Sequence, residues 1–209
     1  MSDNCRVSLY RRIDALRRLW CIQDPFDPFM VADSLPAIRL YETPFSTAGL
    51  HGFIVTSPDK SRATIVLDSR RSEEEQMFDL SHELIHFALH PPTDRVHGHS
   101  PFMEWQANEG AAELLLPRAL LLRILSETRT RIRSAADAAL LVRSLAGRQG
   151  IRETVVRWRM WSLRLDVART LTGEDPKTLP LLPQREYPPL GDGPANWFFP
   201  AGQKPFFVV

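Results

Sequence analysis

The stretch from Phe78 to Pro92, FDLSHELIHFALHPP, constrains the fold of this chain more than any other segment. Apolar residues cover most of the circumference of the helix that it predicts, so this helix is expected to be buried at the centre of a domain. It nevertheless carries His82 and His86 four residues apart, with Glu83 beside the first of them. Burying such groups without partners is costly, so hydrogen bonds within a core or a bound cation must satisfy them.

Local signals predict both ends of this helix. Ser72 and Glu75 have the spacing of a capping box, in which each side chain accepts a hydrogen bond from the other residue's backbone N–H. Apolar residues then continue to Leu89, and Pro91 and Pro92 end the helix because proline cannot continue it.

The sequence before this helix predicts a small sheet. Three runs rich in β-branched and aromatic residues are separated by turn-forming residues, at positions 37–41, 52–56 and 63–68. The first twenty residues predict an amphipathic helix instead, with an apolar stripe at helical spacing that consists of Leu9, Ile13, Leu16 and Trp20.

Helical sequence dominates the part that follows. A second helix is expected to begin at Pro101, capped by Ser100, and to run to Pro117. Leucine-rich helical sequence continues to about residue 145, and a last helix follows the break at GRQG. Beyond Asp166 the sequence is rich in proline and aromatic residues and shows no helical or strand period.

Composition and charge exclude several classes of protein. The net charge is +1, and 44% of the residues are hydrophobic, but no apolar run is long enough to span a bilayer. Charges interrupt the first residues too often for a secretory signal, so we expect a cytoplasmic protein without a membrane partner. Cys5 and Cys21 fit no zinc template and are expected to be reduced thiols.

The two helix histidines have the spacing of metal ligands. Residues four apart on an α-helix are separated by about 6 Å along the axis and about 40° around it, so His82 and His86 project to the same side. Both imidazoles can therefore reach one zinc ion. Glu83 is turned about 100° from His82, which leaves it beside the ion, where it can act as general base toward a water molecule.

The second helix offers candidates for the third ligand that a catalytic zinc ion usually has. Glu104 is the preferred candidate because Asn108 follows one turn later on the same face, where its amide can orient a ligand histidine. Glu113 is a distant alternative, since it lies about 180° around the helix from Glu104.

Four further polar residues are candidates for contacts to a substrate or an oxyanion. His90 lies about 12 Å along the helix axis from His82 and cannot share its ion while the helix is straight. Arg95, His97 and His99 lie in the loop between the two helices. A surface or core role without catalytic function is the alternative reading for each of the three histidines.

Two motifs resemble those of the ImmA/IrrE family of metallopeptidases. SHELIHFALH is similar to the HExxH helix of that family, and EWQANEGAAELLLP is similar to its second motif, in which a glutamate precedes Ala-Asn and the run ends in Leu-Leu-x-Pro. The order of elements is similar too, and LAGRQGIRETVVRWRM resembles the helix-turn-helix-like end of the family. The resemblance covers roughly residues 35 to 165.

The chain departs from the family pattern at three positions. Ile85 stands where the family commonly has glycine, and Gly110 stands where it commonly has phenylalanine. These two departures change the packing around the metal helix without removing a ligand. Arg152 replaces the serine that usually caps the last helix, which weakens the helix-turn-helix analogy.

The resemblance implies a cytoplasmic endopeptidase with one zinc ion per chain, which cuts a specific protein such as a helix-turn-helix repressor of a mobile element or stress response. The fold class that we expect is α+β, with a small three-stranded sheet packed on a zincin-type helical core. The expected domains are a metallopeptidase core over 1–125, a helical, helix-turn-helix-like section over 126–165 and an irregular tail over 166–209.

A regulator that binds DNA or a repressor without cutting it is the alternative function. Its support is the basic last helix and the turn before it, whose arginines could contact phosphates. The arginines concerned are Arg148, Arg152, Arg157 and Arg159.

Overall fold

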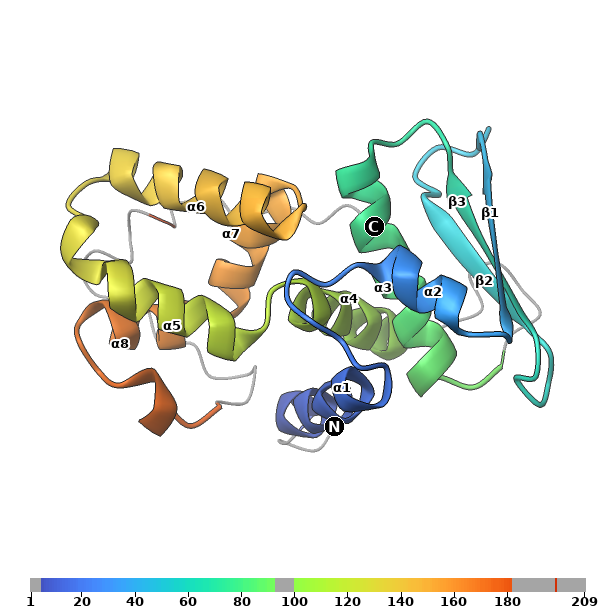
Figure 1. Cartoon of the computed structure of the whole chain (residues 1–209), viewed down its shortest axis with the longest axis horizontal. Helices are drawn as coiled ribbons and strands as arrows, with labels where there is room; N and C mark the ends of the chain where they lie inside the picture. Colours follow the sequence, from blue (N-terminus) through green and yellow to red (C-terminus); the bar gives the residue numbers. More distant parts are fainter. Residues whose placement is uncertain (1–4, 93–99, 182–197, 199–209) are drawn as a thin grey trace. The chain divides into compact units, whose positions relative to one another are not determined.

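The computed structural model describes residues 5–92, 100–181 and 198 of the chain. Within them the fold is α+β, as expected, with eight α-helices and a three-stranded mixed sheet (Figure 1). The described residues form two compact units, one over Arg12–Leu115 and the other made of the described residues before and after that range. The domain boundaries expected at residues 125 and 165 remain a prediction. No helix in the described part of the chain is both long and apolar enough to cross a membrane.

The sheet has the strand order β1-β3-β2 and lies in the unit Arg12–Leu115. Its central strand pairs in parallel with the first strand and antiparallel with the second. Alternate residues of the central strand, Ala63, Ile65 and Leu67, are buried, as in a sheet with one face in the core. The strands are β1 (Ile38–Thr43), β2 (Gly52–Thr56) and β3 (Ala63–Asp68).

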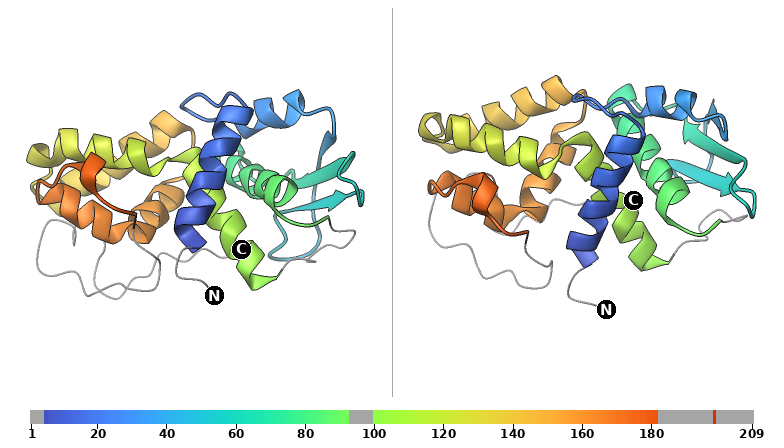
Figure 2. Two further views of the ribbon diagram at one scale, coloured as in Figure 1. Left: turned by 90° about the horizontal axis from the view of Figure 1, so that it is seen from below. Right: turned by 60° about the horizontal axis from the view of Figure 1, so that its bottom comes forward.

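The metal-site helix expected from the sequence is α3 (Glu73–Leu89). It lies between the sheet and α4 (Pro101–Leu115), with α2 (Pro28–Ser34) also packed on it (Figure 2). Its residues are buried without interruption from Gln76 to His86, which agrees with the apolar sequence around the two histidines. The short helix α2 was not predicted.

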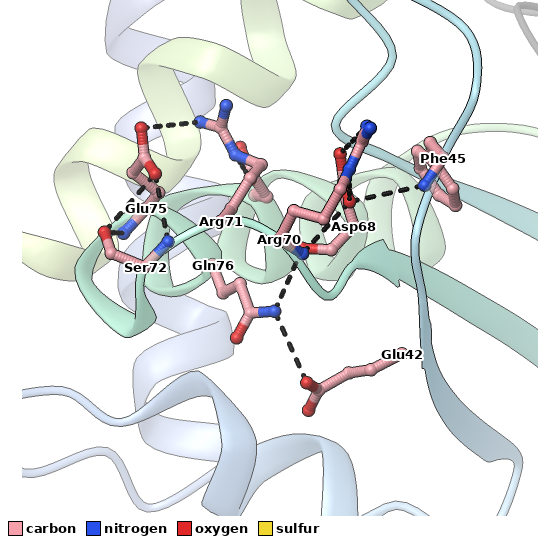
Figure 3. A network of polar contacts seen from close by, with 9 residues as sticks. Glu42, Phe45, Asp68, Arg70, Arg71, Ser72, Glu75 and Gln76 are labelled. Atoms are coloured by element: carbon pink, nitrogen blue, oxygen red, sulfur yellow. Dashed lines mark hydrogen bonds and ion pairs between the residues drawn. The ribbon is translucent and has the colours of Figure 1, made fainter.

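A polar network fixes the N-terminal end of α3 against the sheet (Figure 3). The predicted capping box is present, with Ser72 as the N-cap and Glu75 accepting from its backbone N–H. One turn later, Gln76 Nε2 donates to the backbone oxygen of Asp68 over 3.1 Å and to Glu42 Oε2 over 3.4 Å. The start of α3 is thereby bonded to the ends of β3 and β1.

Two basic side chains from distant parts of the sequence fix the other end of α3. Lys60, in the turn between β2 and β3, donates to the backbone oxygen of Phe87 over 2.6 Å. Arg12, in α1 (Cys5–Leu19), donates to the backbone oxygen of Leu89 over 3.0 Å. Both cations satisfy carbonyls that lack partners at a helix C-terminus and carry its partial negative charge.

The other unit is helical in its described residues. The predicted break at GRQG is present, because Gly150 has φ 63°, a left-handed conformation that suits glycine at a helix C-terminus. The predicted last helix is divided at Leu163. The elements are α5 (Arg118–Thr128), the 3-10 helix η1 (Arg129–Arg131), α6 (Ala135–Gln149), α7 (Glu153–Ser162), α8 (Arg164–Leu171) and the 3-10 helix η2 (Pro176–Thr178).

The expectation of irregular structure beyond Asp166 was wrong for its first residues. Helix α8 continues to Leu171, because Val167 and Leu171 are buried at helical spacing and Asp166 pairs with Arg118. Of the residues from 182 on, the structure describes only Phe198, which is buried.

Candidate metal centre

Three side chains from two adjacent helices converge in the unit Arg12–Leu115. The Nε2 atoms of His82 and His86, one turn apart on α3, lie 2.9 Å from each other. Glu104 Oε2, on α4, lies 3.2 Å from His82 Nε2 and 3.6 Å from His86 Nε2. These three form a potential metal site, in which both histidines are buried and the glutamate is partly exposed.

The spacing of the three atoms fits a metal ion. Tetrahedral ligands at 2.0 to 2.1 Å from zinc lie about 3.3 Å from one another. The observed separations of 2.9, 3.2 and 3.6 Å lie on either side of this value. Two imidazole nitrogens and one carboxylate oxygen are also a donor set that zinc accepts.

The position of the proton on His82 supports the same interpretation. Its Nδ1 lies 3.0 Å from Asn108 Oδ1, and an amide oxygen can only accept, so Nδ1 is the donor. A neutral imidazole has one such proton, so Nε2 directs a lone pair at the other two ligand atoms. Asn108 thus contacts His82 on the side away from the potential metal site, and its role in orienting a ligand stays a prediction.

The electrostatics of the cluster favour positive charge. Burial by itself would lower the pKa of His82, but its protonated form, in which Nε2 also carries a hydrogen, donates to Glu104 and is favoured by the charges of Glu83 and Glu104, so the pKa is raised. Burial would also raise the pKa of Glu104, yet the hydrogen bonds from His82 and His86 hold it well below its ordinary value. Positive charge between these three groups, carried by a proton on a histidine or by a metal ion, is therefore favoured.

Glu83 lies beside this cluster and is buried. Burial raises its pKa to about 7, with the negative charges of Glu104 and Asp79 acting in the same direction and the charge of His82 opposing them. The first residue of β2 borders this carboxylate, since a Cβ atom on Gly52 would lie 3.6 Å from Glu83 Oε1. Glu83 thus combines a position next to the potential metal site with a pKa suited to taking up and releasing a proton near neutral pH.

The family model for the IrrE N-terminal-like domain, Peptidase M78, matches residues 35–156. The chain belongs to the M78 peptidase family. The resemblance of its two motifs to the ImmA/IrrE family is thereby confirmed, and membership indicates a metallopeptidase that acts on protein. No curated protein matches the chain.

The two departures from the M78 pattern on α3 and α4 are in contact. A Cβ atom on Gly110 would lie 3.1 Å from Cγ1 and 3.2 Å from Cδ1 of Ile85. The large residue that the family pattern puts on α4 is missing here, and the side chain of Ile85 on α3 occupies the adjoining space. The absence of a side chain at Gly110 thus permits the close approach of α3 and α4 at Ile85.

The structure positions some of the other candidate residues. His90 is buried behind His86, with 2.8 Å between their Nδ1 atoms, on the side opposite the ligand atoms. Arg95, His97 and His99 lie outside the described residues. Glu113, the alternative third ligand, is buried but does not belong to the cluster found among the described residues.

Sequence reasoning overlooked Gln106, whose Oε1 lies 3.2 Å from His90 Nε2. The equal spacing of His82, His86 and His90 predicts three rings on one face of a helix, but it does not identify their partner on α4.

One arginine assigned to the basic helix is not on the surface. Arg159 is fully buried, and it donates to the backbone oxygen of Leu116 over 3.0 Å and to the hydroxyl of Tyr10. It cannot contact a phosphate, so this part of the DNA-binding alternative was wrong. Arg148 and Arg152 are exposed, while Arg157 is half-buried and donates to Glu153. Arg152 makes no side-chain capping bond at the start of α7, in agreement with the missing serine.

Proposed function

We propose that this M78 protein is a zinc-dependent endopeptidase that hydrolyses one peptide bond in a specific protein. The observation that carries the proposal is the convergence of His82, His86 and Glu104 next to the buried carboxylate of Glu83. His82, His86 and Glu104 would hold one zinc ion, and Asn108 would orient the first of them.

Glu83 is the general base of the proposed reaction. A zinc ion held by His82, His86 and Glu104 would supply Lewis-acid chemistry toward the scissile carbonyl and a water molecule. Glu83 accepts a proton from the attacking water, and the oxygen forms a bond to the carbonyl carbon. Glu83 then donates this proton to the amine nitrogen as the C–N bond breaks.

The edge of the sheet next to Glu83 suits a substrate in an extended conformation. In the described sheet, β2 pairs only with β3, so its other edge has unpaired backbone groups. Gly52 brings the start of β2 next to the carboxylate, since a Cβ atom on it would lie 3.6 Å from Glu83 Oε1. A peptide that adds to this edge would place its carbonyl groups close to the catalytic residue.

As substrate we propose a helix-turn-helix repressor of a mobile element or stress response. The support is membership in the M78 family together with its ImmA/IrrE-like motifs. A repressor encoded next to this protein is the first candidate to test.

The test compares three variants of the full chain, each co-expressed with the candidate repressor. Glu83→Gln is expected to retain one zinc ion per chain by elemental analysis and to lose cleavage, whereas His82→Ala is expected to lose both. Glu74→Gln, at an exposed position of the same helix, is the matched control and is expected to cleave like the parent. Cleavage by Glu83→Gln at the parental rate would exclude Glu83 as the base.

The DNA-binding alternative makes a different prediction. A regulator that acts through Arg148 and Arg152 would bind duplex DNA with an affinity that falls steeply as salt is raised. Binding of that kind by the His82→Ala variant, together with an intact repressor in the presence of the parent protein, would favour the alternative.

A further inference from the structure

The Nδ1 atoms of the two proposed ligand histidines, His82 and His86, have different hydrogen-bond partners. His82 is bonded directly to Asn108 on α4. His86 is bonded to His90, and His90 in turn is bonded to Gln106 on α4. His90 and Gln106 therefore connect His86 to α4, the helix that carries Glu104.

His90 lies at the C-terminal end of α3, one turn after His86. His90 is the C-cap residue, with extended backbone angles of φ −106° and ψ 158°. Its backbone N–H still donates to the backbone oxygen of His86 over 3.1 Å, which keeps the two residues in register. The imidazole lies against the neighbouring ring with 4.7 Å between the ring centroids, the same separation as between the rings of His82 and His86.

The bonds determine where each proton lies. An amide oxygen only accepts, so His90 Nε2 donates to Gln106 Oε1. A neutral imidazole has a single N–H, so His90 Nδ1 must accept, and the donor is His86 Nδ1. His86 Nε2 then carries no proton, and its lone pair is available to a metal ion.

We propose that His90 and Gln106 are positioning residues that set the tautomer and ring orientation of His86 for metal binding. The inference rests on the proposed function, because it concerns the same zinc site. It also assigns three separate tasks to α4, since Glu104 supplies a ligand atom while Gln106 and Asn108 support one histidine each.

The test uses a pair of substitutions at Gln106 in the full-length protein. Gln106→Met keeps a similar length but removes the amide oxygen, and Gln106→Glu keeps an acceptor at the same place. Zinc affinity is measured by competition with a chromophoric chelator, and the absorption spectrum of the cobalt-substituted protein reports the ligand geometry. We expect Gln106→Met to bind zinc about 10 to 100 times more weakly than the parent, and Gln106→Glu to bind it at least as tightly.

Several results would contradict a positioning role of His90 and Gln106. Equal zinc affinity of Gln106→Met and the parent would overturn the proposal, as would an equal loss in both Gln106 variants, because the acceptor would then be irrelevant. His90→Phe is expected to weaken zinc binding as much as Gln106→Met, and circular dichroism of the metal-free protein shows whether it folds. If His90→Phe does not fold, the pair at Gln106 is decisive alone. A parent protein that binds no zinc would refute the proposed function itself, which separates the two failures.

Discussion

Each compact unit contains buried polar side chains, but the chemical character of their partners differs between Arg159 in one unit and the histidine–glutamate cluster in the other. In the helical unit, the guanidinium of Arg159 is surrounded by complementary partners, namely the Leu116 carbonyl, the Tyr10 hydroxyl and the face of the Tyr10 ring. In the sheet unit, His82, His86 and Glu104 direct acceptor atoms at one another. The oxygen acceptors next to Arg159 offset the cost of burying its charge. Acceptor atoms that face each other are suited to a cation, and this difference separates the buried charge of Arg159 from the potential metal site.

The largest effect is expected from removing a ligand in the sheet unit. Glu104→Ala should weaken zinc binding by about 1000-fold, because a direct ligand contributes more than the 10 to 100-fold of a supporting residue. Titration with zinc against a competing chelator measures this. The comparator is Arg159→Met in the other unit, which should leave zinc affinity unchanged if that arginine is purely structural. An equal loss of zinc affinity in Glu104→Ala and Arg159→Met would contradict the assignment of Glu104 as a ligand and of Arg159 as a structural residue.

Arg159→Met should in turn destabilise the protein by about 3 kcal/mol, since the variant leaves the buried Leu116 carbonyl and Tyr10 hydroxyl without their charged donor. Urea unfolding monitored by circular dichroism gives the free energy of unfolding. Arg148→Met removes an exposed arginine and should change this free energy by less than about 0.5 kcal/mol. A mild effect of Arg159→Met would mean that its bonds contribute little.

Two helix glycines, Gly110 in the sheet unit and Gly147 in the helical unit, differ in the space available for a side chain. Gly110→Phe should destabilise the protein by about 2 to 3 kcal/mol, because the new side chain collides with Ile85 and with Ile13, whose Cδ1 atom is 3.2 Å from a Cβ at that position. Adding Ile85→Gly should relieve the clash, with a favourable coupling of about 1 kcal/mol or more in a double-mutant cycle. At Gly147 of α6 nothing lies within 4 Å of a Cβ, so Gly147→Ala should stabilise the helix by up to about 1 kcal/mol. Additive effects of Gly110→Phe and Ile85→Gly would show that the two positions do not compensate.

The pH dependence of stability should reveal the cost of the buried base. The pKa of Glu83 rises from 4.5 to about 7 on folding, so between these values the folded state holds a proton that the unfolded state has lost. The free energy of unfolding therefore falls as pH rises from 4.5 to 7, and stays reduced above pH 7. Glu83→Gln should stabilise the metal-free protein at pH 8 by on the order of 2 kcal/mol and have little effect at pH 4.5. If Glu83→Gln stabilised the protein equally at pH 4.5 and pH 8, the raised pKa of Glu83 would be excluded as the cause.

The parts of the fold that sequence alone predicted have local signals. Helix α3 is an example, because Ser72 and Glu75 set its start and the prolines after His90 set its end within the same short stretch. Glu104 and Asn108 were also selected by local spacing, one turn apart on the face that meets the two histidines. Helix α2 had a local signal, Asp27 as N-cap before Pro28, but its seven residues are too short to show a period.

The features that could not be predicted depend on contacts between distant residues. The role of Gln106 follows from the way α4 crosses the end of α3, which no spacing within α4 reveals. Arg159 was misread for the same reason, since its partner Tyr10 is 149 positions away in the sequence. The pairing of β1 with β3 rather than with its neighbour in sequence, β2, is likewise a property of the assembled sheet.

Helix α3 is anchored at both ends, by Gln76 and the capping box at one and by Lys60 and Arg12 at the other. The separation of the His82 and His86 imidazoles is therefore set by the pitch of a single helix with restrained ends. The backbone holds this separation without a bound ion. We expect zinc to leave and return without unfolding the protein, so that its exchange is governed by the strength of coordination and not by refolding.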